Sequence, residues 1–152
     1  MQHSTHSANN HYTLMFVIMV LAGLLSTMNV WVDKYEDIRF SLNDLYMTLL
    51  MTGWMFLFMG LFSREWRGIL LGLFFIAINL WCIRTQFLID EKEYKRGMIP
   101  HHSMAVHMSK KLLAKQNSTA KQNSTAKQNS ISPFLKNIIH TQEKEILFMK
   151  MK

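Results

Sequence analysis

The sequence contains little cysteine, and its longest apolar stretches contain no charge. Cys82 is the single cysteine, so an internal disulfide and a metal site built from cysteine alone are both excluded. It lies in an apolar run, where a small buried side chain is the simplest interpretation. The sequence also has no nucleophile motif, phosphate-binding loop, paired-carboxylate site or zinc-protease signature. We therefore expect a protein that is not an enzyme.

The net charge of +7 over 152 residues raises the question of nucleic-acid binding. Most of the basic residues, however, are scattered through the part of the chain after residue 90, without a recognition helix or a row of stacking aromatic side chains. Attraction to anionic lipid headgroups explains this distribution more simply. We expect a lipid bilayer as a partner, and no nucleic acid.

Apolar residues are concentrated in residues 13–89, which we predict to be a three-helix transmembrane domain behind a disordered N-terminal tail, residues 1–12. The predicted spans are about 13–32, 45–62 and 68–84, each close to the length that crosses a hydrocarbon core at 1.5 Å per residue. No Asp, Glu, Lys or Arg lies within a span core, which argues against a proton-coupled transporter or a voltage sensor. We interpret the glycines of the second and third spans as ordinary membrane-helix composition: Gly53, Gly60, Gly68 and Gly72.

The basic residues of the short links indicate an orientation. Arg64 and Arg67 lie in the link 63–67, and the positive-inside rule favours a cytoplasmic position for it. Three spans then place the N-terminus in the cytoplasm and the region after residue 90 outside. For a bacterial inner membrane, that region is periplasmic.

Residues 90–152 have the pattern of a helical hairpin rich in histidine and methionine. The hexapeptide AKQNST recurs in residues 114–130, has no large apolar side chain, and predicts a mobile low-complexity insert at the hairpin tip. Pro100 should kink the first helix or start a new one. A single hairpin has a thin core, so we expect support from a second copy, the membrane surface or a metal. A homo-oligomer is the expected assembly.

The segment 98–108, MIPHHSMAVHM, holds three imidazoles and three thioethers. Imidazole suits copper or zinc, whereas the soft thioether sulfur selects Cu(I) over zinc. The sequence therefore predicts a copper site, Cu(I) rather than Cu(II), with the candidate ligands His101, His102, Met98, Met104, His107 and Met108. The alternative stays open, because methionine at helical spacing is usually core and a buried histidine is usually held by hydrogen bonds.

The strings MIPHHSMAVHMSK and IIHTQEKEILFMKM resemble the bacterial Domain of Unknown Function 305 family. The resemblance covers about residues 86–113 and 132–151, and the membrane half looks like a three-span subgroup. It implies an all-α fold of ferritin-like or four-helix-bundle type and a role in copper handling. The family motif falls on Met98, His101, His102, Met108, Gln142, Glu145 and Met149, of which the last three would support the site from the facing helix.

Two hypotheses of function follow. The first is a membrane-anchored metal-binding protein, with copper as the metal, that acts in copper sequestration or tolerance. The second is a structural or interaction protein whose hairpin self-associates into a helical bundle without metal. Lys95 stands where the family often has a further thioether, which argues against a larger methionine cluster.

Overall fold

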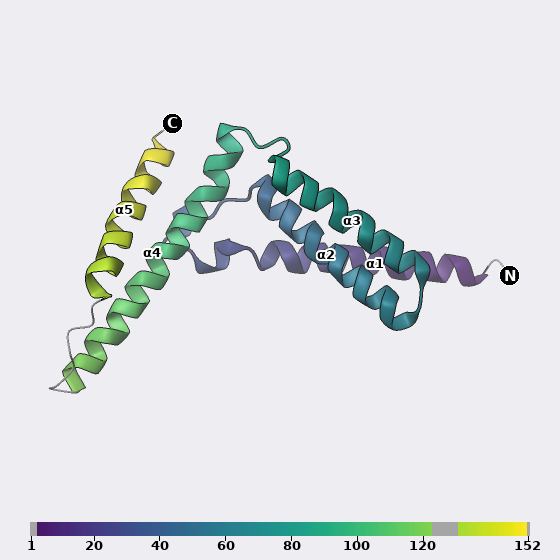
Figure 1. Ribbon diagram of the computed structural model, residues 1–152, viewed down its shortest axis with the longest axis horizontal. Helices are drawn as coiled ribbons and strands as arrows, with labels where there is room; N and C mark the ends of the chain where they lie inside the picture. The colour runs from purple at the N-terminus through teal and green to yellow at the C-terminus, as the bar shows by residue number, and fades with distance from the viewer. Residues whose placement is uncertain (1–2, 123–130, 152) are drawn as a thin grey trace. The chain divides into compact units, whose positions relative to one another are not determined.

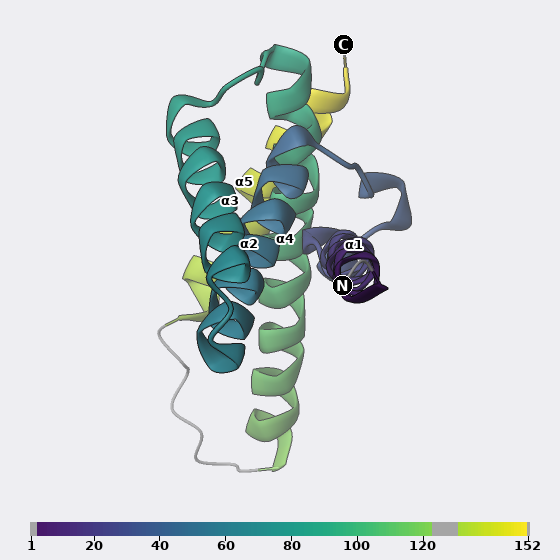
Figure 2. The same ribbon diagram turned by 90° about the vertical axis from the view of Figure 1, so that its right-hand side faces the viewer.

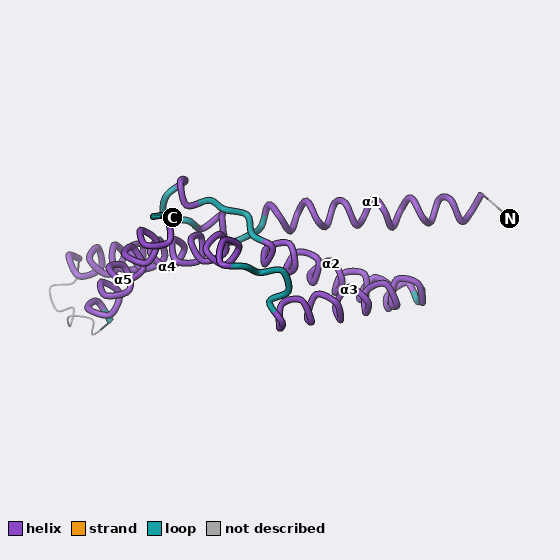
Figure 3. Tube along the Cα trace, turned by 90° about the horizontal axis from the view of Figure 1, so that it is seen from above, coloured by secondary structure: helices purple, strands orange, loops and turns teal. Residues whose placement is uncertain are grey.

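The structure is a computed structural model that describes residues 3–122 and 131–151. In these ranges helices are joined by loops and there is no strand (Figure 3), which confirms the expected all-α class. The elements in chain order are α1 (His3–Leu25), the 3-10 turns η1 (Met28–Trp31) and η2 (Tyr35–Asp37), α2 (Leu42–Ser63), α3 (Trp66–Thr85), α4 (Glu91–Gln122) and α5 (Ser132–Lys150).

The chain divides into two compact units. One, which we call the apolar unit, contains α1, α2 and α3. The other, which we call the hairpin unit, contains α4 and α5 together with residues 28–40, the link between α1 and α2. The sequence predicts this link to be part of the transmembrane domain 13–89. It instead belongs with the hairpin, because its acidic side chains bind residues of α4 and α5.

Within residues 3–122 and 131–151, three helical stretches are long and apolar enough to cross a membrane: Tyr12–Trp31, Leu42–Ser63 and Trp66–Thr85. They lie close to the predicted spans. The helix α1 begins at His3, so residues 3–12 are helical rather than disordered as predicted. Residues 3–11 contain neither proline nor glycine, and an existing helix extends at little cost. Residues 1–2 lie outside the described part of the chain.

The helices α2 and α3 run side by side (Figures 1 and 2), as the short link between them predicts. Their contact depends on glycine. A Cβ atom built on Gly72 would lie 2.5 Å from the backbone nitrogen of Leu57, and one on Gly60 would lie 2.5 Å from that of Ile69. The interpretation of these glycines as ordinary composition is therefore wrong, because they allow the two backbones to approach closely.

The hairpin unit is built on the contact between α4 and α5, which lie next to each other in opposite directions (Figure 1). Ile99 and Val106 of α4 and Ile146 of α5 form its core, and Ile139 and Met149 pack against them. This is the thin core that the sequence predicts. Leu135 is buried as well, and with Ile146 it marks the inward side of α5.

The course of α4 decides one alternative and corrects one prediction. The helix runs through Pro100, so no new helix starts there, and it continues to Gln122. Residues 114–122 of the repeat are therefore helical, contrary to the predicted loop 114–130, because alanine, lysine and glutamine are good helix formers. Residues 123–130 lie outside the described part of the chain.

Candidate functional site

The six predicted ligands are distributed around α4. Successive residues of a helix are turned by about 100°, so adjacent side chains such as His101 and His102 cannot share one side. The buried face of the helix, which includes Ile99, Ser103 and Val106, lies between His102 and His107 and is opposite His101. The histidine and methionine residues consequently face three directions: toward α5, toward the link 28–40, and outward.

His102 faces α5. Its Nδ1 atom lies 2.9 Å from Oε2 of Glu145, and this buried nitrogen makes no hydrogen bond of regular geometry. Burial lowers the pKa of His102 below its ordinary value, while the Glu145 carboxylate opposes that shift and His101 adds to it. The imidazole is therefore neutral at pH 7, which is the form that binds metals. Its nearest charged neighbour is the residue that the sequence predicts as a supporting group.

His107 faces the link. Its Nδ1 atom lies 3.9 Å from Oδ1 of Asp33, whose other oxygen lies 2.7 Å from Nζ of Lys110. This histidine belongs to a charged network rather than to a cluster of soft ligands. Of the remaining supporting candidates on α5, Met149 packs against the core and Gln142 is half-buried.

The outward set consists of Met98, His101, Met104 and Met108. His101 and Met108 are exposed, and Met98 and Met104 are half-buried. Met98 and Met104 lie three residues before and after His101, so one helical turn separates the imidazole from a thioether on each side. Among the described residues, no three His, Cys, Asp or Glu side chains gather closely enough to hold a metal ion. A metal site on α4 thus depends on its thioethers.

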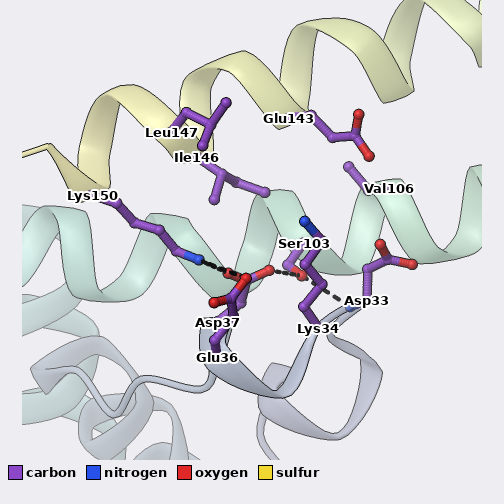
Figure 4. A pocket seen from close by; sticks show the side chains of 10 residues that line it. All are labelled: Asp33, Lys34, Glu36, Asp37, Ser103, Val106, Glu143, Ile146, Leu147 and Lys150. Atoms are coloured by element: carbon purple, nitrogen blue, oxygen red, sulfur yellow. Dashed lines mark hydrogen bonds and ion pairs between the residues drawn. The ribbon is translucent and has the colours of Figure 1, made fainter.

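A second group of residues, which the sequence does not reveal, is centred on Asp37 of the link. This carboxylate is 2% exposed. Lys150 Nζ of α5 lies 2.5 Å from its Oδ1 atom, and Ser103 Oγ of α4 donates a 2.6 Å hydrogen bond to Oδ2 (Figure 4). The backbone N–H of Asp33 donates to the same Ser103 oxygen at 2.9 Å. One buried carboxylate thus joins the link to both helices of the hairpin.

Lys110 makes a parallel connection. Its Nζ atom lies 2.7 Å from Oδ2 of Asp33 and 2.9 Å from Oε1 of Glu143 on α5. The hydrogen bonds to these two carboxylates raise the pKa of Lys110, so its charge persists. We call the set Asp33, Asp37, Ser103, Lys110, Glu143 and Lys150 the link network.

The link network borders a cavity of about 170 Å³ with one apolar wall, formed by Val106, Ile146 and Leu147 (Figure 4). Its acids and lysines are paired with one another. They therefore neutralise charge and hold three segments together. No local pattern could have predicted the network, because Asp37 and Ser103 are 66 residues apart.

The fold and these sites together define a helical protein with three helices apolar enough for a membrane and a charged two-helix hairpin. The chain is 46% identical over 107 residues to "Uncharacterized protein L153" of Acanthamoeba polyphaga mimivirus, a match that covers 67% of this chain and 70% of that protein. The chain therefore belongs to the family of this viral protein. No model of a known family matches the chain. No solved structure matches it either.

Proposed function

We propose that this protein is a membrane-anchored copper-binding protein whose α4 helix takes up Cu(I), in copper sequestration or tolerance. The outward set carries the proposal. An accessible imidazole, His101, has a thioether one turn away on either side, at Met98 and Met104, and Met108 follows one turn beyond. This donor set is soft, contains no thiol, and needs no deprotonation of sulfur, which favours Cu(I) over zinc.

The other histidines have secondary parts in this proposal. His102 and His107 lie beside the carboxylates of Glu145 and Asp33, so they are less free to turn toward a metal on the outer side of α4. The His101 and His102 rings are 5.9 Å apart, which keeps His102 close enough to join a site after a change of rotamer. From α5, Gln142, Glu145 and Met149 act by holding α4 in place.

The link network supports a topology for the anchor. Asp33 and Asp37 precede α2, whereas their lysine partners Lys110 and Lys150 follow α3. Link and hairpin must be on the same side of the membrane for these pairs to form, so α2 and α3 cross it as a pair. With α1 crossing as well, the N-terminus and the basic link 63–67 lie in the cytoplasm and the hairpin lies outside.

Cysteine labelling tests this topology in sealed vesicles. In a Cys82→Ser background, single cysteines at the exposed Tyr35 and Lys111 should react with a membrane-impermeant maleimide from one side. A cysteine at the exposed Ser63 should react from the other side only. Labelling of all three from the same side would contradict the proposed crossings.

Competition for Cu(I) tests the metal. The full chain in detergent is titrated against a chromogenic Cu(I) chelator, and the metal content is measured by elemental analysis. We expect a Kd tighter than micromolar, and at least tenfold weaker binding for His101→Ala and for the pair Met98→Leu with Met104→Leu. His140→Ala, an exposed histidine on α5, is the matched control and should bind as the wild type does. Binding weaker than micromolar, or equal binding by all variants, would reject the copper site.

A metal-free interaction role is the second candidate, and exposed apolar side chains favour it. On the parts of α4 and α5 nearer the hairpin tip, four large apolar side chains are exposed, of which only the first belongs to the outward set: Met108, Leu112, Ile131 and Phe134. Pairing of two such surfaces would complete a four-helix bundle of ferritin-like type and a homo-oligomer. The mass of the detergent-solubilised protein by light scattering, with and without a chelator, separates the two roles. A dimer that persists without metal and dissociates on Phe134→Ser favours this candidate.

A further inference from the structure

The end of α5 carries apolar side chains that the hairpin does not cover. Leu147, Phe148 and Met151 are 62%, 71% and 74% exposed, whereas Ile146 and Met149 of the same turns face the core. Met151 lies four residues from Leu147 and three from Phe148, so the three side chains are neighbours on the helix surface. We call them the terminal patch. A contiguous exposed apolar patch of this kind marks a site of interaction.

The link network holds this patch near the start of an apolar stretch. Lys150, between Phe148 and Met151, lies 2.5 Å from Asp37 and 3.7 Å from Glu36. Asp37 is five residues before Leu42, the first residue of α2, and five residues reach at most about 18 Å. The last turn of α5 is therefore tethered, through one ion pair and a few residues, to the end of a helix apolar enough to cross a membrane.

A second tether is independent of the first. Ile146 packs in one cluster with Ile99, which is eight residues, or about 12 Å of helix, beyond Glu91 at the start of α4. Glu91 in turn follows Thr85, the end of α3, by six residues. The terminal patch is therefore at the end of the hairpin where α4 begins and α5 ends. At this end the chain arrives from α3 of the apolar unit.

The composition around the patch fits a lipid surface. Tyr35, two residues before Asp37 in the link, is exposed, and such an amphipathic ring prefers the headgroup layer. Lys144 is exposed one turn before Phe148, and Lys34 is exposed beside Tyr35. Exposed aromatic and lysine side chains beside an apolar patch are typical of segments that lie on anionic membranes.

We propose that the terminal patch rests on the membrane surface, with Leu147, Phe148 and Met151 inserted among anionic lipid headgroups. The occupant is lipid rather than a second copy because the two tethers keep the bilayer permanently close. A tethered surface has a high effective concentration, whereas a second copy has to diffuse to the patch. The hairpin is then fixed to the membrane by the end of α5 as well as by the chain that leads into α4.

Site-directed spin labelling measures this contact in the full chain. Met151→Cys is labelled with a nitroxide in a Cys82→Ser background, and the protein is placed in nanodiscs containing anionic lipid. Thr141→Cys is the matched control, since Thr141 is exposed on the same helix about 15 Å from Met151 along the axis. Collisions with lipid-soluble oxygen and with a water-soluble nickel chelate then report the environment of each label.

We expect the label at 151 to collide with oxygen and to be sheltered from nickel, and the label at 141 to show the reverse. Adding Leu147→Ser and Phe148→Ser should return position 151 to the behaviour of position 141. Equal nickel accessibility at both positions in the parent protein would overturn the proposal. So would a label at 151 that is closed to both reagents and broadened by a second label, because that pattern identifies a second copy as the occupant.

Discussion

Replacing Asp37 by alanine should destabilise the hairpin unit by about 2–4 kcal/mol. Asp37 is 2% exposed and is bound by Ser103 and Lys150. A hydrogen bond to a charged group contributes about 1.5–3 kcal/mol, and breaking a buried ion pair costs about 3–5 kcal/mol. The expected loss is smaller than for a fully buried ion pair for two reasons. Lys150 is 24% exposed, and Glu36, whose Oε1 atom lies 3.7 Å from Lys150 Nζ, remains as its partner.

Amide hydrogen exchange is the suitable assay, because it reports the opening of α5 separately from that of the membrane helices. A loss of about 3 kcal/mol corresponds to a roughly 100-fold faster exchange of the α5 amides. Glu36→Ala is the matched control. It removes a neighbouring carboxylate near the same lysine, but one that is 67% exposed, so its effect should stay below about 0.5 kcal/mol.

The double variant Asp37→Ala with Lys150→Ala tests the mechanism. If the loss of stability comes from an unpaired lysine, the double variant should lose less stability than the two single variants lose together. Equal exchange rates in Asp37→Ala and Glu36→Ala would refute the reasoning, because burial would then make no difference to the two carboxylates.

Three further substitutions extend these expectations. Ser103→Ala removes the hydroxyl that donates to Asp37 and should speed α5 exchange about tenfold, equivalent to about 1.4 kcal/mol. Because burial lowers the pKa of His102, its contribution to stability is complete above pH 6.5 and is lost as the pH falls further, which a pH series of thermal unfolding would detect. Glu145→Gln removes the carboxylate that opposes this pKa shift, so the loss of stability at low pH should be larger. Gly72→Ala should separate α2 from α3 at a cost of about 1–3 kcal/mol, and an unchanged melting temperature in detergent would contradict this.

The apolar stretches were predictable because they are defined by consecutive residues. A long uncharged run has one stable arrangement in lipid, a helix that satisfies its own backbone groups. The buried face of α5 has a similarly local origin, because Leu135 and Ile146 are eleven residues, or about three helical turns, apart. The predicted disorder of residues 3–12 and 114–122 was wrong, because composition does not register how readily an existing helix extends.

The site was less predictable, because it depends on what packs against α4. Spacing showed that imidazoles and thioethers share one helix, but not that the link covers the side bearing Ser103 and His107. That packing depends on Asp33 and Asp37, which lie far away in the sequence between two apolar stretches. Acids in such a link are usually solvated, and no local signal distinguishes a buried one.

The link network also bears on what a bound metal could do. The sequence predicts that so thin a core needs a second copy, the membrane or a metal, and the hairpin obtains part of that support from its own chain through Asp37 and Lys110. The outward set, by contrast, lies on the side of α4 away from both the core and the link. Copper bound at His101 would therefore not be needed for folding, and its release would leave the hairpin intact.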